Sequence, residues 1–151
     1  MKLMTIVITF LSLNVYANCN GQLGIDWINP DGSTGGFVSN TAKVDKTVYI
    51  KDNAQICGKA QVLENAIVED EAIISGNAVI SGSAHVYDKA RVSGNALVYG
   101  SAQIYNEALV TENAKVYEKA EVFGFAKLAG NVLFHGIARV WDRTLNSGNY
   151  Y

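Results

Sequence analysis

The sequence predicts an all-β solenoid, in which short parallel strands wind into about six coils with three six-residue segments in each coil. Two observations lead to this prediction. From Thr41 to Asp142 the chain divides into seventeen hexads without an insertion, and fifteen of them have alanine in the second place. The residues at the hexad junctions then repeat with a longer period of 18. Units of fixed length that stack on one another are typical of solenoid proteins.

The first residues, 1–17, are typical of a secretory signal peptide. Lys2 supplies a positive start, the run from Leu3 to Val15 is mostly apolar, and small residues place a cleavage site after Ala17. A membrane anchor is the alternative, but the apolar run is short for a bilayer span. We therefore expect a mature chain that is periplasmic or secreted, with no membrane attachment once the signal peptide is removed.

The segment 18–40 does not follow the repeat and is expected to form an N-terminal cap. It contains Trp27 and the only proline, Pro30. It also contains Cys19, and the one other cysteine of the chain is Cys57 in the repeats. A pair of cysteines in an exported protein predicts a disulfide more readily than a metal site, with two free thiols as the alternative.

Residues 41–142 form the repeat body, and GGFVSN, which begins at Gly35, fits as a degenerate first hexad. The fourth place is valine or isoleucine in fifteen of the seventeen hexads. Apolar residues in the second and fourth places predict a short strand with both side chains on one side. A helix is excluded, because a six-residue period would spread these side chains around its circumference. Since alanine fills half of the inward places, the core must be narrow, like the inside of a thin triangular prism.

The junctions between hexads indicate that three hexads make one coil, because every third junction has the same chemistry. Gly76-Asn77 and Gly94-Asn95 represent the first corner, Gly82-Ser83 and Gly100-Ser101 the second, and Asp52, Asp70 and Asp88 the third. Glycine and asparagine accept a positive φ readily, and aspartate does so to a lesser degree. The sequence therefore predicts a prism with three distinguishable edges.

The sequence pattern A-x-V-x-G-N resembles that of the hexapeptide-repeat, left-handed β-helix superfamily, which is best known for trimeric acyltransferases. The resemblance covers about 100 residues and implies a single-stranded, left-handed parallel β-helix. The usual motif of the family places glycine directly after the large aliphatic residue, whereas here glycine comes one place later, as in Val98-Tyr99-Gly100. The opening GGFVSNTAKVDKTVYI also resembles the entry to non-enzymatic repeat modules of exported bacterial proteins.

The last nine residues, 143–151, are the expected C-terminal tail or cap. Bulkier residues precede them: Leu128, Phe134, Ile137 and Trp141. An open solenoid end exposes its core and its strand edges. We therefore expect these four side chains to fill the end of the core and to cover the last coil together with the tail.

Charge and histidine content argue against several function classes. The formal net charge is −2, and it becomes −3 when the signal peptide with its one lysine is removed, so that no basic face for nucleic acid is expected. The two histidines, His85 and His135, occupy outward places without a loop that could form a pocket. The acyltransferases of the resembled superfamily have such loops and a catalytic histidine. We expect no catalytic residue, no cofactor and no metal, and a solvated edge at the aspartate corner.

The fifth place of each hexad points outward, so residues 18 apart are expected to stack about 4.8 Å apart along the axis. We name the three faces by these residues. The Tyr87 face carries Tyr87, Tyr105 and Phe123, the Tyr99 face carries Tyr99 and Tyr117, and the small-residue face carries Ser75, Ser93 and Thr111. Leu97 and Leu133, in the third place, make the Tyr99 face the most apolar of the three.

Two interpretations of the aromatic faces are compatible. The rings stabilise neighbouring coils, or they contact a glycan or a protein at the cell surface or in the periplasm. The favoured function is an exported structural or adhesive solenoid that performs no catalysis. The alternative is a glycan-binding module that uses Tyr87, Tyr105 and Phe123, with an acyltransferase as a distant third. Self-association is expected through the face of Tyr99, Leu97 and Leu133.

Overall fold

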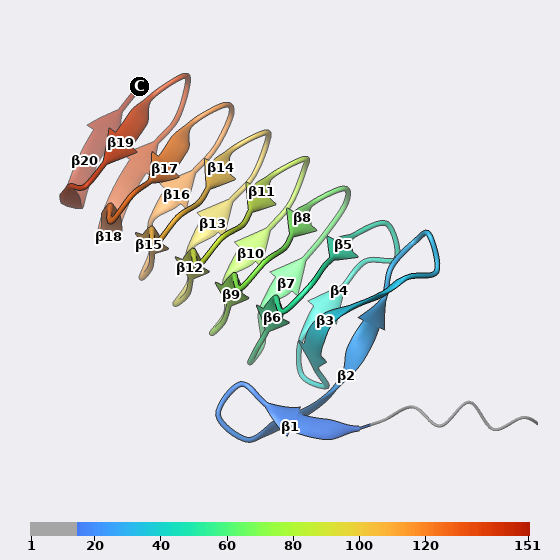
Figure 1. Cartoon of the computed structure of the whole chain (residues 1–151). Helices are drawn as coiled ribbons and strands as arrows, with labels where there is room; N and C mark the ends of the chain where they lie inside the picture. Colours follow the sequence, from blue (N-terminus) through green and yellow to red (C-terminus); the bar gives the residue numbers. More distant parts are fainter. Residues whose placement is uncertain (1–14) are drawn as a thin grey trace, which may run out of the picture.

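The computed structural model describes residues 15–151, so most of the predicted signal peptide lies outside the described residues. The described chain is built from β-strands that stack in a single row of coils, with β1 at one end and β20 at the other (Figure 1). Residues 15–151 contain no helix that is long and apolar enough to cross a membrane. The predicted cleavage site after Ala17 falls inside strand β1 (Tyr16–Asn18).

The strands sort into the three predicted faces. The Tyr87 face is a six-stranded sheet of β5 (Tyr49–Ile50), β8 (Ile67–Val68), β11 (His85–Val86), β14 (Gln103–Ile104), β17 (Glu121–Phe123) and β19 (Arg139–Trp141). The small-residue face consists of β3 (Thr34–Ser39), β6 (Gln55–Ile56), β9 (Ile73–Ile74), β12 (Arg91–Val92), β15 (Leu109–Val110) and the start of β18 (Lys127–Phe134). The Tyr99 face consists of β4 (Lys43–Val44), β7 (Gln61–Val62), β10 (Val79–Ile80), β13 (Leu97–Val98), β16 (Lys115–Val116) and the end of β18.

The register confirms the 18-residue coil. Within each face, up to β18 and β19, successive strands pair in parallel at a spacing of 18 residues, as Val79 pairs with Leu97 and His85 with Gln103. Because the Tyr87 face has six strands, the solenoid has about six coils. The predicted fold class, an all-β parallel solenoid, is confirmed.

The core is the narrow column that the sequence predicts. The second and fourth places of the hexads from Val48 to Val132 are all fully buried, and Phe134 keeps only 2% exposure. Alanine in the second place lets the three walls approach one another, and the valine or isoleucine of the fourth place fills the space between them. These side chains form one continuous hydrophobic cluster along the solenoid.

The corners differ from the prediction in one respect. From Asp52 to Asp142 the positive φ belongs to the sixth place of every hexad, whether that residue is glycine, aspartate, asparagine or glutamate. The first-place asparagines are not in this conformation. Their side-chain amides instead hydrogen-bond one another from coil to coil, in the order Asn77, Asn95, Asn113 and Asn131.

Acidic residues fit the sixth place because their side chains reach the next coil. The Asp70 carboxylate accepts the backbone N–H of Asp88 at 3.0 Å, and the Glu112 carboxylate accepts that of Gly130 at 2.8 Å. These bonds satisfy backbone donors at a turn where no ladder bond is available. The aspartate corner is therefore a structural edge.

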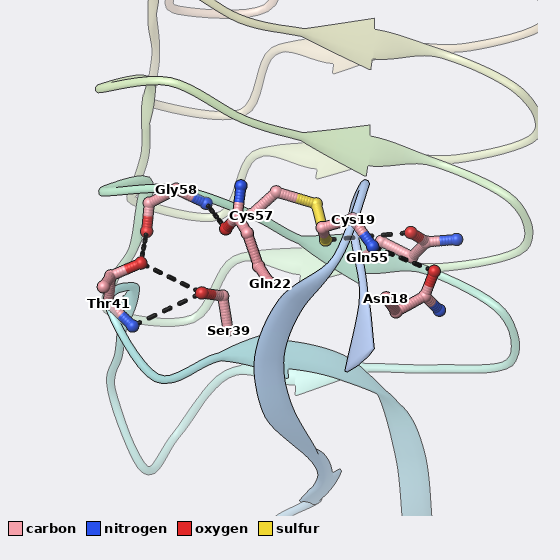
Figure 2. The surroundings of a disulfide bond; sticks show 8 residues. All are labelled: Asn18, Cys19, Gln22, Ser39, Thr41, Gln55, Cys57 and Gly58. Atoms are coloured by element: carbon pink, nitrogen blue, oxygen red, sulfur yellow. Dashed lines mark hydrogen bonds between the residues drawn. A yellow bond between two sulfur atoms is a disulfide. The ribbon is translucent and has the colours of Figure 1, made fainter. Parts of the chain in front are cut away.

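The N-terminal cap is an antiparallel arrangement that runs into the first coil. Strand β1 pairs with β2 (Gln22–Ile28), β2 pairs with β3, and β3 pairs in parallel with β6. The register of Phe37 with Gln55 confirms that GGFVSN acts as the first hexad. The predicted disulfide joins Cys19 to Cys57, with Cα atoms 5.7 Å apart, and ties this cap to the repeats (Figure 2).

Side chains of β2 and the turn after it cover the N-terminal edge of the Tyr87 face. The Trp27 indole N–H donates to the carbonyl of Val48 at 3.1 Å, and Asn29 accepts the N–H of Ile50 at 2.9 Å. Asn29 is 4% exposed, so this polar side chain is buried where a strand would otherwise continue the sheet. The sequence offered no repeat signal for either residue.

At the other end, β20 (Thr144–Tyr150) pairs in parallel with β18. Leu128 and Phe134 are buried, as expected. The expectation that Ile137 and Trp141 also cover the last coil is wrong, since they are 80% and 63% exposed. Ile137 lies in the turn before β19 and Trp141 in the outward fifth place at the end of β19, and β20 pairs with β18 but not with β19.

Candidate interaction surface

The Tyr99 face carries a ladder of stacked rings, because its fifth places lie on strands that are neighbours in the sheet. The rings of Tyr99 and Tyr117 are 4.9 Å apart and inclined by 2°, and those of Tyr117 and His135 are 4.7 Å apart and inclined by 5°. The ring of Tyr151 lies against His135 at 5.9 Å. The C-terminal end of this ladder is therefore covered by Tyr151.

The other end of the same ladder is open. The fifth place one coil earlier is Ser81, and among residues 15–151 no ring stacks on the side of Tyr99 opposite Tyr117. Tyr99 is 37% exposed. Val79 and Leu97, which pair on adjacent strands, place two half-buried aliphatic side chains beside it. One uncovered ring surface and an aliphatic strip thus lie together on this face.

The ladder of the Tyr87 face is covered at both ends. The rings of Tyr87, Tyr105 and Phe123 stack with centroid distances of 5.0 and 5.1 Å, each pair inclined by 6°. His85 lies against Tyr87 at 4.4 Å, and the Arg139 guanidinium lies 5.3 Å from the ring centre of Phe123. Each ring therefore already has a neighbour on both sides, and the last contact has the geometry of a cation–π interaction.

A polar network supports that ladder, and the sequence analysis did not predict it. Glu69 accepts one hydrogen bond from Lys51 at 3.2 Å and pairs with His85 at 2.6 Å. Glu121 pairs with Arg139 at 2.8 Å and accepts the Tyr105 hydroxyl at 3.1 Å. His85 lies 16 residues after Glu69, and Glu121 lies 16 after Tyr105, so a diagonal spacing of 16 between third and fifth places would have revealed both contacts.

The pKa values of this network reflect its packing. Burial, followed by repulsion from neighbouring Tyr105 and Asp88, raises the pKa of Tyr87 to about 12. Burial also acts to raise the pKa of Glu69, but the hydrogen bonds from Lys51 and His85 outweigh it and hold that pKa below its ordinary value. The folded solenoid therefore favours a neutral Tyr87 and an ionised Glu69.

Ionisation of Tyr87 is expected to destabilise the solenoid at high pH. Its folded pKa of about 12 exceeds the ordinary value of 10.0, so the folded state holds the proton more tightly than the unfolded state does. Stability is then unaffected below pH 10 and falls as the pH rises from 10 to about 12. The variant Tyr87→Phe keeps the ring and removes the hydroxyl. Its urea midpoint should fall less steeply over this range than that of the parent, whereas an equal slope would contradict the assignment.

The two histidines lie where the sequence analysis placed them, at outward positions, and each has a hydrogen-bond partner. His85 pairs with Glu69, as described, and His135 pairs with the Asn149 side chain at 2.7 Å. Their rings belong to different faces, His85 in β11 and His135 after β18. Within residues 15–151 no group of three or more His, Cys, Asp and Glu side chains is arranged to hold a metal ion.

Comparison with known proteins supports the repeat. A family model described as the YdcK beta solenoid repeat matches residues 72–88 and 90–103. The matched residues run from β9 to β14, in the middle of the solenoid. Searches of curated proteins and of solved structures give no significant match. The match supports a β-solenoid repeat, and the narrower resemblance to the hexapeptide-repeat superfamily stays a prediction.

Proposed function

We propose that the protein is an exported structural or adhesive β-solenoid that presents a rigid contact surface outside the cytoplasm and performs no catalysis. The observation that carries this proposal is the Tyr99 face. It combines an uncovered ring surface on Tyr99 with the aliphatic side chains of Leu97 and Leu133 on a continuous sheet. Exposed apolar surface next to aromatic side chains is typical of contact sites between proteins.

Export is supported by the Cys19–Cys57 disulfide, since such bonds persist in oxidising compartments. In this proposal the mature chain begins near Asn18 and is periplasmic or secreted. Mass spectrometry of the protein recovered from the periplasm and the medium checks it. A chain that keeps Met1 and stays with reduced cysteines in the cytoplasm would overturn it.

A second copy is the first partner to test, and Leu97 is the residue to change. We expect the parent to sediment faster with rising concentration and Leu97→Glu to stay monomeric, because a carboxylate on this strip would be desolvated in the contact. The control is Gln103→Glu, which places the same charge in the third place of the neighbouring hexad, on the Tyr87 face. A parent that remains monomeric, or an equal effect of both variants, argues against self-association through the Tyr99 face.

A glycan-binding module on the Tyr87 face is the alternative. A sugar that stacks on an aromatic ring needs a free ring surface, and the rings of Tyr87, Tyr105 and Phe123 have neighbours on both sides. The free surface of Tyr99 suits such stacking better. Glycan-array binding that is lost in Tyr87→Ser but kept in Tyr99→Ser would place the glycan site on the Tyr87 face and would contradict the preference for Tyr99.

A further inference from the structure

The sheet of the Tyr87 face ends one strand short of the rest of the solenoid. Strand β20 adds a strand to the small-residue face through Thr144 and Leu145, and to the Tyr99 face through residues 147–150. No strand among residues 15–151 pairs with the outer side of β19. The C-terminal end therefore has a step, one strand deep, above β19 (Figure 1).

The edge of β19 presents backbone groups that the rest of this sheet uses for pairing. In each earlier coil the third and fifth residues donate their N–H groups to the next coil, as Gln103 does to Ala120 and Tyr105 to Val122. The corresponding groups of β19 belong to Arg139 and Trp141, and no strand within residues 15–151 accepts them. At the opposite end of this sheet the side chains of Trp27 and Asn29 hydrogen-bond to backbone groups in and next to the edge strand β5. The N-terminal edge of the sheet is therefore covered, whereas the edge of β19 is open.

A hollow adjoins the open edge. It has a volume of about 390 Å³ and an apolar floor that includes Phe134, Leu145 and Tyr150. Trp141 and Arg143 line it as well, and Trp141 is one of the most exposed large side chains of the protein. Arg139 is paired with Glu121, but the structure gives the Arg143 guanidinium no carboxylate partner among the described residues. The strand edge thus lies beside a hollow that can accept an apolar side chain, and Arg143 supplies a cationic group at this hollow.

We propose that β19 binds a single extended polypeptide strand, which becomes the seventh strand of the Tyr87 face. Only a polypeptide offers alternating donors and acceptors at the spacing of a strand edge. The occupant carries an apolar side chain that enters the hollow and an acidic group that faces Arg143. The flat end of a second solenoid does not fit, because β20 stands one strand further out than β19 and would meet it first.

The sequence of the repeat itself supplies a probe. The hexad SAHVYD, residues 83–88, belongs to the same face and ends in an acidic residue. A synthetic peptide of this sequence, added to ¹⁵N-labelled protein, is expected to give saturable shifts of the Arg139 and Trp141 amides and to slow their hydrogen exchange. Arg143→Gln should weaken binding about tenfold, since it removes one charge-assisted hydrogen bond.

The matched control is the same peptide with N-methyl valine in the fourth place. This control changes only the peptide, so the protein and its fold stay the same in both experiments. In this fold the fourth-place N–H points to the preceding coil, as that of Ile50 points to Asn29. The methylated peptide should therefore not bind. The proposal is overturned if the unmodified peptide gives no saturable shift, if both peptides bind equally, or if the shifts fall at β4, the edge strand of the other end, and spare β19.

Discussion

Ala102→Leu is expected to destabilise the solenoid by about 3 kcal/mol, at the upper end of the usual range for an overpacked core. Ala102 is fully buried, and so are Ile104 in the same hexad and Ala84 and Ala120 one coil to either side. The chain joins the three walls of the prism at tight corners in every coil, so the walls cannot move apart to admit three more carbon atoms. The strain is therefore expected to break pairing in the central coils.

The control for this variant is the adjacent residue. Gln103→Leu introduces the same side chain in the third place, which is exposed and outward, and should change stability by no more than about 0.5 kcal/mol. Urea unfolding followed by far-ultraviolet circular dichroism measures both variants. If the two variants unfold at the same urea concentration, the second place does not face a tightly filled core.

The double variant Cys19→Ala/Cys57→Ala is expected to lose about 4 kcal/mol, the value that the chain-entropy model assigns to a crosslink between cysteines 38 residues apart. The crosslink is the covalent tie between the cap, at the turn before β2, and the hexad that contains Cys57. Stability in a solenoid is carried by contacts between neighbouring units. We therefore expect the loss to appear first in the cap and the coils next to it.

Hydrogen exchange resolves where that loss occurs. In the double variant the amides of Phe37 and Val38, in the strand that joins the cap to the repeats, should exchange much faster than in the parent. The amides of β13 and β14, near the middle of the solenoid, should change little. Uniform acceleration along the whole chain would show that the stabilisation is not local to the cap, and no acceleration would show that the disulfide does not stabilise the cap; either result contradicts the prediction.

The regular part of the molecule could be predicted because equivalent residues of successive coils occupy equivalent environments. The positions of Tyr99 above Ser81 and of Tyr105 above Tyr87 follow from the period of 18, and the inward alanines follow from the six-residue period. The sequence analysis also identified Cys19 and Cys57 correctly as partners. The stacked and the inward positions depend on residues that stand in equivalent places of successive coils, whereas the disulfide prediction depends on the presence of two cysteines in a chain expected to be exported.

The ends and the diagonal contacts could not be predicted in the same way. Trp27 and Asn29 cover a strand edge from a segment without a repeat, so no equivalent residue points to their role. Trp141 was expected to cover the last coil, but its fifth place points outward and leaves it exposed. Glu69 and His85 lie in adjacent coils, but in different places of their hexads. A comparison of residues that share the same hexad place does not reveal this contact.

The central claim is that the Tyr99 face makes contacts outside the cytoplasm, and photo-crosslinking in the producing cells tests it most directly. A photoreactive amino acid replaces Lys115, an exposed third-place residue of that face, and in a second strain it replaces Gln103, the corresponding exposed residue of the Tyr87 face. We predict a discrete crosslinked species from position 115 and none from position 103. Crosslinks from position 103 alone, or from neither position, would contradict the claim.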